Sequence, residues 1–147
     1  MSRSLNLSQA GEYAIAALSR LALFAPQPVT VERLASVQCI PQAFLSKILG
    51  RCAKAGIVRA KTGPSGGMAL AREAGKITIL EIIEACEGSY ARQLCVFYPD
   101  RACDGASCQI YCPLRKEEEA LRQRLARATL ADMAAALKDH PDAQGGR

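Results

Sequence analysis

The sequence predicts a mainly helical fold that carries one small β-hairpin. Half of its 147 residues are apolar, but only 5% are aromatic and Trp is absent. That balance, with its many Ala and Leu residues, favours helices over a β-sandwich. Apolar residues recur at helical spacing in several segments, whereas residues 57–72 change to the spacing of short strands. The length suits one full domain, or a small domain with an appendage.

The first two helices are predicted from the signals at their ends. The apolar spacing indicates a helix from about Ser8 to Phe24, because the two prolines of APQP stop it there. Thr30 is the expected N-cap of a short second helix, VERLASV, and Glu32 is favourably placed in its first turn.

A third helix, PQAFLSKILGRCAKA, follows the tight turn QCI. Pro41 suits the first helical position, and Gly56 suits the position just after the helix. The apolar residues at helical spacing predict one buried stripe, formed by Phe44, Leu45, Ile48, Leu49 and Cys52.

The next segment changes period. IVRAK is typical of a short strand, TGPSGG of a Gly-rich turn and MALAR of a returning strand. Three helices followed by a hairpin with small and basic residues at its tip give the element order of a winged helix-turn-helix. We expect this domain to occupy residues 1–75.

The second half begins with another helix. Thr78 and Glu81 form a capping box, T-I-L-E, and the helix is expected to end near Gly88. A cysteine-rich loop is then expected over residues 89–112.

Two more helices are expected after this loop. Pro113 is predicted to open a long charged helix, and T-L-A-D, starting at Thr129, is predicted to begin a short last helix. Residues 76–138 would therefore hold a linker helix, the loop and a dimerisation helix, followed by a disordered tail over residues 139–147.

Charge is spread unevenly along the chain. Residues 1–75 hold nine Lys and Arg against three Asp and Glu, whereas residues 76–147 hold ten against eleven. The first half therefore carries the positive field, as a nucleic-acid contact requires. Glu12 and Arg20 interrupt the first apolar run, which argues against a signal peptide, and no segment is long enough to cross a membrane. We expect a cytoplasmic protein.

The third helix and the hairpin supply the candidate DNA-binding residues. In a helix-turn-helix the second helix enters the major groove, where Gln pairs with adenine and Lys donates to guanine. Glycines let the hairpin backbone approach phosphates closely. The candidates are Gln42, Ser46, Lys47 and Arg51 on the helix, and Lys61, Thr62, Ser65, Gly66 and Gly67 on the hairpin. The alternative is a solvated helix face beside an ordinary hairpin.

Five segments in this order resemble the Rrf-two (Rrf2) family of bacterial transcription regulators: EYAIAAL, IPQAFLSKIL, KAGIVRAKTGPSGGMALAR, ITILEIIEACEG and TLADM. The likeness covers about residues 5–137, and the GPSGG hairpin is its most specific part. It implies a homodimer on double-stranded operator DNA with dyad symmetry, and a dimerisation helix starting at Pro113. Many members place Arg at the position of Thr62, an aromatic residue at that of Met68, and some an acidic residue at that of Ser46.

The resemblance also suggests a role for the cysteines. Sensory members of the family hold an iron–sulfur cluster in the loop before the dimer helix, on three cysteines and a variable fourth ligand. Cys95 fits the first ligand and Cys103 the second, and Cys108 and Cys112 compete for the third. Thiolates are the ligands such clusters prefer, so all four can complete a [2Fe–2S] or [4Fe–4S] site. Alternatively, a carboxylate such as that of Asp100 or Asp104, or a small molecule, fills the last position.

Other uses of these four cysteines remain open. They could hold zinc, although the loop has no C-x2-C pair, or Cys108 and Cys112 could form a disulfide. They could also be inert. We expect Cys39, Cys52 and Cys86 to be core residues, because they lie in apolar helical contexts.

The sequence thus predicts a transcriptional repressor whose operator binding is controlled by an iron–sulfur cluster that senses nitric oxide, redox state or iron. The alternative is a metal-free thiol switch, or a zinc-stabilised regulator, of the same fold. An enzyme is not expected, because the chain has no C-x2-C motif, no nucleotide-binding Gly fingerprint and no His near a cysteine.

Overall fold

The computed structural model describes residues 7–88 and 111–139, with the side chains of residues 111–115 left out of the description. Helices and a two-stranded hairpin make up this part of the chain, which confirms the predicted mainly helical fold. The elements are α1 (Gln9–Phe24), α2 (Val31–Gln38), α3 (Gln42–Lys54), β1 (Val58–Lys61), β2 (Gly67–Leu70), the 3-10 turn η1 (Ala74–Lys76), α4 (Ile79–Glu87), α5 (Tyr111–Arg127) and α6 (Leu130–Asp139).

The helix starts predicted at Thr30, Thr78 and Thr129 are confirmed by single hydrogen bonds. Thr30 Oγ1 accepts from the amide of Arg33 at 3.2 Å, as an N-cap should. Thr78 and Glu81 form a complete capping box, in which the amide of Thr78 donates to the Glu81 carboxylate at 2.8 Å. Similar bonds join Thr129 to Asp132 before α6.

Two details at α3 differ from the expectation. Pro41 is the N-cap and not the first helical residue, because its backbone is extended (φ −56°, ψ 126°). Phe44 was wrongly placed in the buried stripe, since its side chain is 37% exposed. Its ring instead makes an edge contact with Tyr13 of α1, with ring centroids 5.8 Å apart. The remaining members of the predicted stripe are buried: Leu45, Ile48, Leu49 and Cys52.

One hydrophobic core joins the helices of both halves of the chain. Leu18 of α1, Ile48 of α3, Ile82 of α4 and Leu130 of α6 are each at most 1% exposed and belong to the same cluster. The hairpin is antiparallel, with Val58 opposite Leu70 and Lys61 opposite Gly67. This core fixes α3 and the base of the hairpin on the same body.

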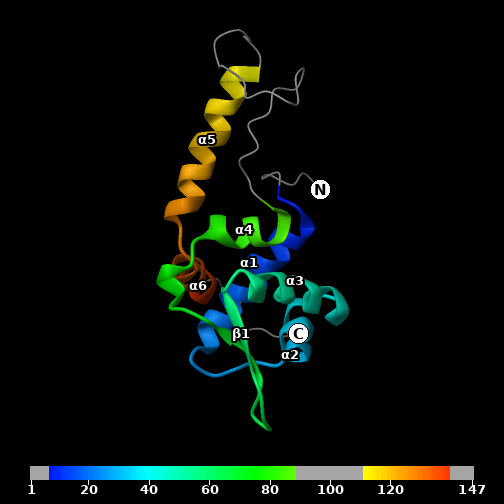
Figure 1. Cartoon of the computed structure of the whole chain (residues 1–147). Coiled ribbons are helices and arrows are strands. Elements are labelled where there is room, and N and C mark those ends of the chain that lie inside the picture. The colour runs from blue at the N-terminus through cyan, green and yellow to red at the C-terminus, as the bar shows by residue number, and fades with distance from the viewer. Residues whose placement is uncertain (1–6, 89–110, 140–147) are drawn as a thin grey trace.

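The hairpin and α5 project from opposite ends of this body (Figure 1). The helix α5 begins at Tyr111, so Pro113 lies inside its first turn, where a missing amide costs little, and does not open it. Cys112 is therefore a helical residue. Of the helices in the described part, none is long and apolar enough to cross a membrane. The tail predicted over residues 139–147 lies outside the description, except for Asp139, which ends α6.

Candidate nucleic-acid interface

The helix α3 presents one polar face to solvent. Gln42, Ser46 and Lys47 are exposed, whereas Leu45 and Leu49, between and beyond them, are buried. The hydroxyl of Ser46 donates to the carbonyl oxygen of Gln42 at 2.9 Å, which holds this side chain against its own helix. The predicted candidates at the start of α3 thus share an accessible surface.

A tight turn sets the position of α3 relative to α2. Cys39 adopts the left-handed conformation (φ 52°), and the amide of Ile40 returns to the carbonyl of Ala35 at 3.0 Å. Cys39 was expected in the core but is exposed, because it is the C-cap of α2 and lies in the turn that follows the helix. The amide group of Gln38 donates to the carbonyl of Ala16 at 3.2 Å, so α2 is attached to α1 just before the turn.

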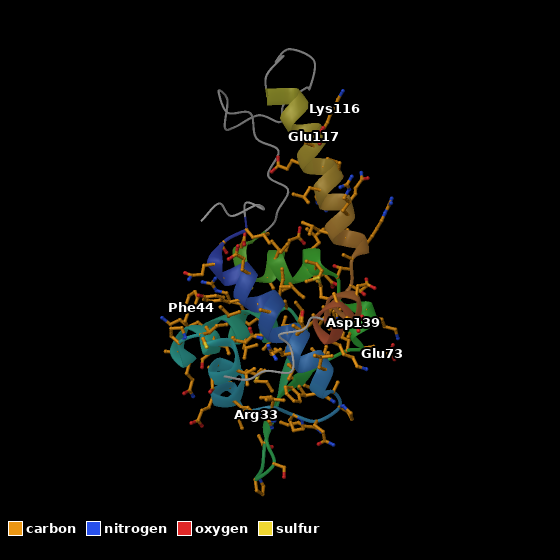
Figure 2. All side chains as sticks on the ribbon, turned by 180° about the vertical axis from the view of Figure 1, so that it is seen from behind. Arg33, Phe44, Glu73, Lys116, Glu117 and Asp139 are labelled. Carbon is orange, nitrogen blue, oxygen red and sulfur yellow. The ribbon has the colours of Figure 1, made fainter. Side chains whose placement is uncertain are left out.

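A cation–π contact fixes the other end of α2. The guanidinium carbon of Arg33 lies 5.0 Å from the centroid of the Phe24 ring at the end of α1. Arg33 and Phe44 are both marked in Figure 2, on the helices that make up the helix-turn-helix. The helix α2 is thus attached to α1 near both of its ends.

Arg51 makes a different contact from the other candidates on α3. Its Nη1 atom donates to the carbonyl oxygen of Cys86, in the last turn of α4, at 2.7 Å. That carbonyl has no partner within α4, because the last four carbonyls of a helix lack one. Arg51 therefore joins the helix α3 to the end of α4.

The hairpin tip carries the remaining candidates. Lys61, Thr62 and Ser65 are exposed, and Gly66 and Gly67 are half-buried. These two glycines are required by the hairpin itself: a Cβ atom at Gly66 would collide with the Lys61 carbonyl, and one at Gly67 would lie 2.6 Å from the carbonyl group of Val29. Sequence reasoning assigned both to contact with DNA and missed this role.

A short backbone bridge attaches the hairpin to the segment before α2. Val29 and Met68 exchange two backbone hydrogen bonds of 2.9 and 2.7 Å, which attach the segment before α2 to the second strand. Gly67, immediately before Met68, adopts φ 153°, and the absence of a side chain allows the close approach of Val29.

The lysines of this surface form no ion pair with another described residue. Within residues 7–88 and 111–139, the ion pairs join Arg72 to Glu81, Lys76 to Glu73 and Arg122 to Glu119. No described ion pair involves Lys47 or Lys61. Lysines without a carboxylate partner can neutralise phosphates and release counterions, which is the source of non-specific DNA affinity.

The four candidate cluster ligands cannot be placed by side chain. Cys95, Cys103 and Cys108 lie outside the described residues, and Cys112 is in the first turn of α5, where side chains are not described. The described residues contain no group of three or more His, Cys, Asp and Glu side chains suited to a metal ion. The ligand assignment therefore stays a prediction, based on the chemistry of four thiols in one short segment.

The described residues next to that segment are firmly attached. Glu87, the last residue of α4, accepts a hydrogen bond of 2.8 Å from the amide of Ser8, the N-cap of α1. Together with the bond from Arg51 to Cys86, this links the end of α4 to the start of α1 and to α3. No pattern in the sequence indicates either long-range contact.

A further feature is an apolar groove between α1 and α6. Its volume is about 480 Å³, and its walls include Ile15 and Ala16 of α1 and Met133 and Leu137 of α6. The exposed fraction of Met133 is 38%, which is high for a large apolar side chain.

Comparisons with known proteins agree with this geometry. The family model Rrf2, described as an iron-dependent transcriptional regulator, matches residues 7–136. A relative from Aquifex aeolicus is named as an HTH-type transcriptional regulator. It is 40% identical over 94 residues, which cover 64% of this chain and 65% of that protein. The chain thus spans just under two thirds of that relative.

Two solved structures share the whole fold. IscR of T. potens superimposes with a TM-score of 0.71 and 30% identity, over 98% of this chain and 94% of that one. CymR, the global cysteine regulator of B. subtilis, superimposes with a TM-score of 0.74 and 23% identity, over 90% of this chain and 98% of that one, and supports the fold alone. The winged helix-turn-helix is confirmed, and the relatives are DNA-binding regulators and not enzymes. The chain belongs to the Rrf2 family of transcriptional regulators.

Proposed function

We propose that this regulator is a homodimer that represses transcription, and that an iron–sulfur cluster in residues 89–112 controls its binding to operator DNA. The observation that carries the proposal is the position of the cysteine segment. It runs from the end of α4, which is bonded to the helix α3, to the start of α5. A change in that segment would therefore be transmitted through α4 to α3, the proposed recognition helix.

For DNA binding, we assign base contacts to Gln42, Ser46 and Lys47 and backbone contacts to the hairpin. The exposed start of α3 supports the first assignment, since the first residues of a recognition helix meet base edges. The exposed tip with Lys61, Thr62 and Ser65 supports the second, with Gly66 and Gly67 shaping the turn. Arg51 is better suited to positioning α3, because its guanidinium is bonded to α4.

The homodimer is supported by two apolar surfaces that the described residues leave partly exposed. The helix α5 extends away from the body, and Lys116 and Glu117 lie near its far end (Figure 2). Leu121 is only half-buried, and the groove between α1 and α6 leaves Met133 exposed. We propose that α5 pairs with its copy and that the groove receives apolar side chains of the second subunit. Two such subunits would present their α3 helices to an operator with dyad symmetry.

The cluster is supported by the donor set. Cys95, Cys103, Cys108 and Cys112 are four thiols within 18 residues, and thiolates are the ligands that iron–sulfur clusters prefer. Such a group, when bound, supplies reactivity toward nitric oxide, oxygen or iron scarcity. The chain's own contribution is to hold the segment between two helices and to transmit its state through Cys86 and Glu87.

The test is anaerobic purification followed by absorbance spectroscopy and by iron and acid-labile sulfide assays. We expect a brown protein with near-stoichiometric iron and sulfide, and loss of both in Cys103→Ser. The matched control is Cys39→Ser, because Cys39 is an exposed cysteine outside the segment. A colourless protein after anaerobic reconstitution, holding zinc or only free thiols, would contradict the cluster and favour the thiol-switch or zinc-stabilised regulator.

Operator binding is tested separately. Duplexes selected from a random library by the purified protein should share two half-sites related by a dyad, and the affinity should fall steeply with salt. The cluster-loaded and cluster-free proteins should differ in affinity for the selected duplex. Equal affinities would contradict control by the cluster but not DNA binding itself.

A further inference from the structure

An exposed glycine, Gly50, lies in the interior of α3. The helix continues after it for one more turn and ends at Lys54. Glycine weakens a helix relative to alanine, because its backbone loses more conformational freedom on folding. A Cβ atom at Gly50 would meet no described atom within 4 Å, so packing within the described part of the chain does not account for the missing side chain. The glycine instead leaves room for a partner that approaches the helix from outside.

Gly50 lies on the same side of α3 as the candidate base-reading residues. It is four positions after Ser46 and three after Lys47, and residues with these separations are neighbours on a helix surface. Leu45 and Leu49 are buried in the core on the other side of the helix. The exposed face of α3 therefore continues from its first turns over Gly50.

The position of Gly50 along α3 corresponds to the border of a major groove. A helix rises about 1.5 Å per residue, so Gly50 is about 12 Å from Gln42 along the axis. A major groove is also about 12 Å wide. When the first turn of α3 lies on base edges, as the proposed function requires, Gly50 lies where the sugar–phosphate backbone borders the groove.

A lysine follows Gly50 on the same face. Lys54 is four positions further on, and helical side chains lean toward the turn before them, which here is the turn of Gly50. Lys54 is exposed, and no ion pair within the described part of the chain involves it. The neighbouring cation, Arg51, is instead bonded to the carbonyl of Cys86. Lys54 is thus available to an anion that lies against Gly50.

We propose that one strand of the operator crosses α3 at Gly50, and that Lys54 binds the phosphate that lies there. A glycine lets a phosphate approach the helix closely, and a lysine ammonium neutralises it as a point charge. An exposed lysine alone would be explained as a solvated side chain. The helix-weakening glycine one turn before it is the observation that requires a close partner. This contact rests on the proposed function, because it assumes that α3 is the recognition helix.

Substitutions at Gly50 should change stability and DNA affinity in opposite directions. Gly50→Ala should raise the melting temperature by about 3 °C, because alanine favours a helix over glycine. Its affinity for the duplex selected from a random library should nonetheless fall by about tenfold, because the added methyl group displaces the phosphate. Gly50→Leu should melt no lower than the wild type and should bind still more weakly. The matched control is Gly75→Ala in η1, where a Cβ atom also meets no described atom within 4 Å, and its affinity should be unchanged.

The role of Lys54 is tested by the salt dependence of the same affinity. Lys54→Ala should lower the slope of log affinity against log salt concentration by about one unit. Lys138→Ala, which removes an exposed lysine of α6, should leave the slope unchanged. Because both groups act on one phosphate, Lys54→Ala should cost less affinity in the Gly50→Leu protein than in the wild type.

Three results would overturn the proposal: an unchanged affinity of Gly50→Leu, a lower stability of Gly50→Ala, or effects of Gly50→Leu and Lys54→Ala that simply add. Each of them leaves the proposed function intact as long as the wild-type protein selects a duplex with two half-sites. A wild-type protein that selects no duplex would contradict the proposed function, and this phosphate contact with it.

Discussion

Arg51 Nη1 donates a hydrogen bond of 2.7 Å to the carbonyl oxygen of Cys86. The two residues are on α3 and α4, and the bond places a positive charge at the C-terminal end of α4. That location is favourable for a cation, because the exposed carbonyls of a helix end carry partial negative charge. The side chain that the sequence assigned to DNA contact thus connects α3 to the end of α4.

The Arg51→Ala protein should therefore lose stability and should bind DNA with an unchanged salt dependence. We expect the free energy of unfolding to fall by about 1.5 kcal/mol, the usual worth of a hydrogen bond to a charged group. Lys54→Ala, on the same helix and exposed, is the control and should change it by less than about 0.5 kcal/mol. Urea denaturation measures both.

The salt dependence of DNA affinity distinguishes a residue that positions α3 from a residue that contacts phosphate. A residue that neutralises one phosphate contributes about one unit to the slope of log affinity against log salt concentration. Lys47→Ala and Lys61→Ala test for such contacts, whereas the slope for Arg51→Ala should equal that of the wild type. If Arg51→Ala lost a unit of slope and no stability, the guanidinium would be a phosphate contact after all.

The hairpin should depend on Gly67 for its attachment. An added methyl group would meet the Val29 carbonyl at 2.6 Å, on a backbone at φ 153° that other residues rarely adopt. We expect Gly67→Ala to reduce the free energy of unfolding by about 1–3 kcal/mol and to weaken DNA binding. Gly75→Ala is the matched control, since a Cβ atom there meets nothing within 4 Å.

The parts of the fold that local rules determine were predictable from the sequence. A capping box such as that of Thr78 and Glu81 involves only residues close in the chain, so their types and spacing in the sequence predict it. The prediction that Phe44 is buried was wrong, because helical spacing does not distinguish a partly exposed position at the edge of a stripe from a buried one. The prediction that Cys39 is a core residue was wrong, because the left-handed turn after α2 has no glycine that would indicate it in the sequence.

The candidate site likewise contains residues that local patterns predict and residues that only tertiary contacts place. The exposed polar face of α3 follows from helical periodicity alone, so Gln42 and Lys47 were accessible to sequence reasoning. The contacts of Arg51 with Cys86 and of Glu87 with Ser8 join residues 35 and 79 positions apart. Tertiary packing decides such pairs, and no local pattern indicates them.

A change on α5 should separate dimer formation from folding. Leu121 is half-buried and is not among the side chains packed on the core, in contrast to Leu125. A carboxylate there should break a pairing between two α5 helices, because a charge in an apolar contact is costly. We expect Leu121→Glu to be a folded monomer by light scattering and circular dichroism, and Glu117→Gln to remain a dimer. A Leu121→Glu dimer of unchanged stability would exclude α5 as the interface.

Acid should weaken the link between the hairpin and α4. Burial tends to raise the pKa of Glu81, but the amide of Thr78 and the guanidinium of Arg72 donate to this carboxylate, and the net effect lowers the pKa below its ordinary value of 4.5. A group whose pKa is lower in the folded state adds stability above its unfolded pKa and loses it as pH falls through the folded one. The Arg72–Glu81 pair is partly exposed, so its share is about 0.5 kcal/mol. We expect a double-mutant cycle of Arg72→Ala and Glu81→Gln to give that coupling energy near neutral pH and none once Glu81 is protonated, well below pH 4.5. A coupling that persisted in acid would mean that the two residues interact through packing and not through charge.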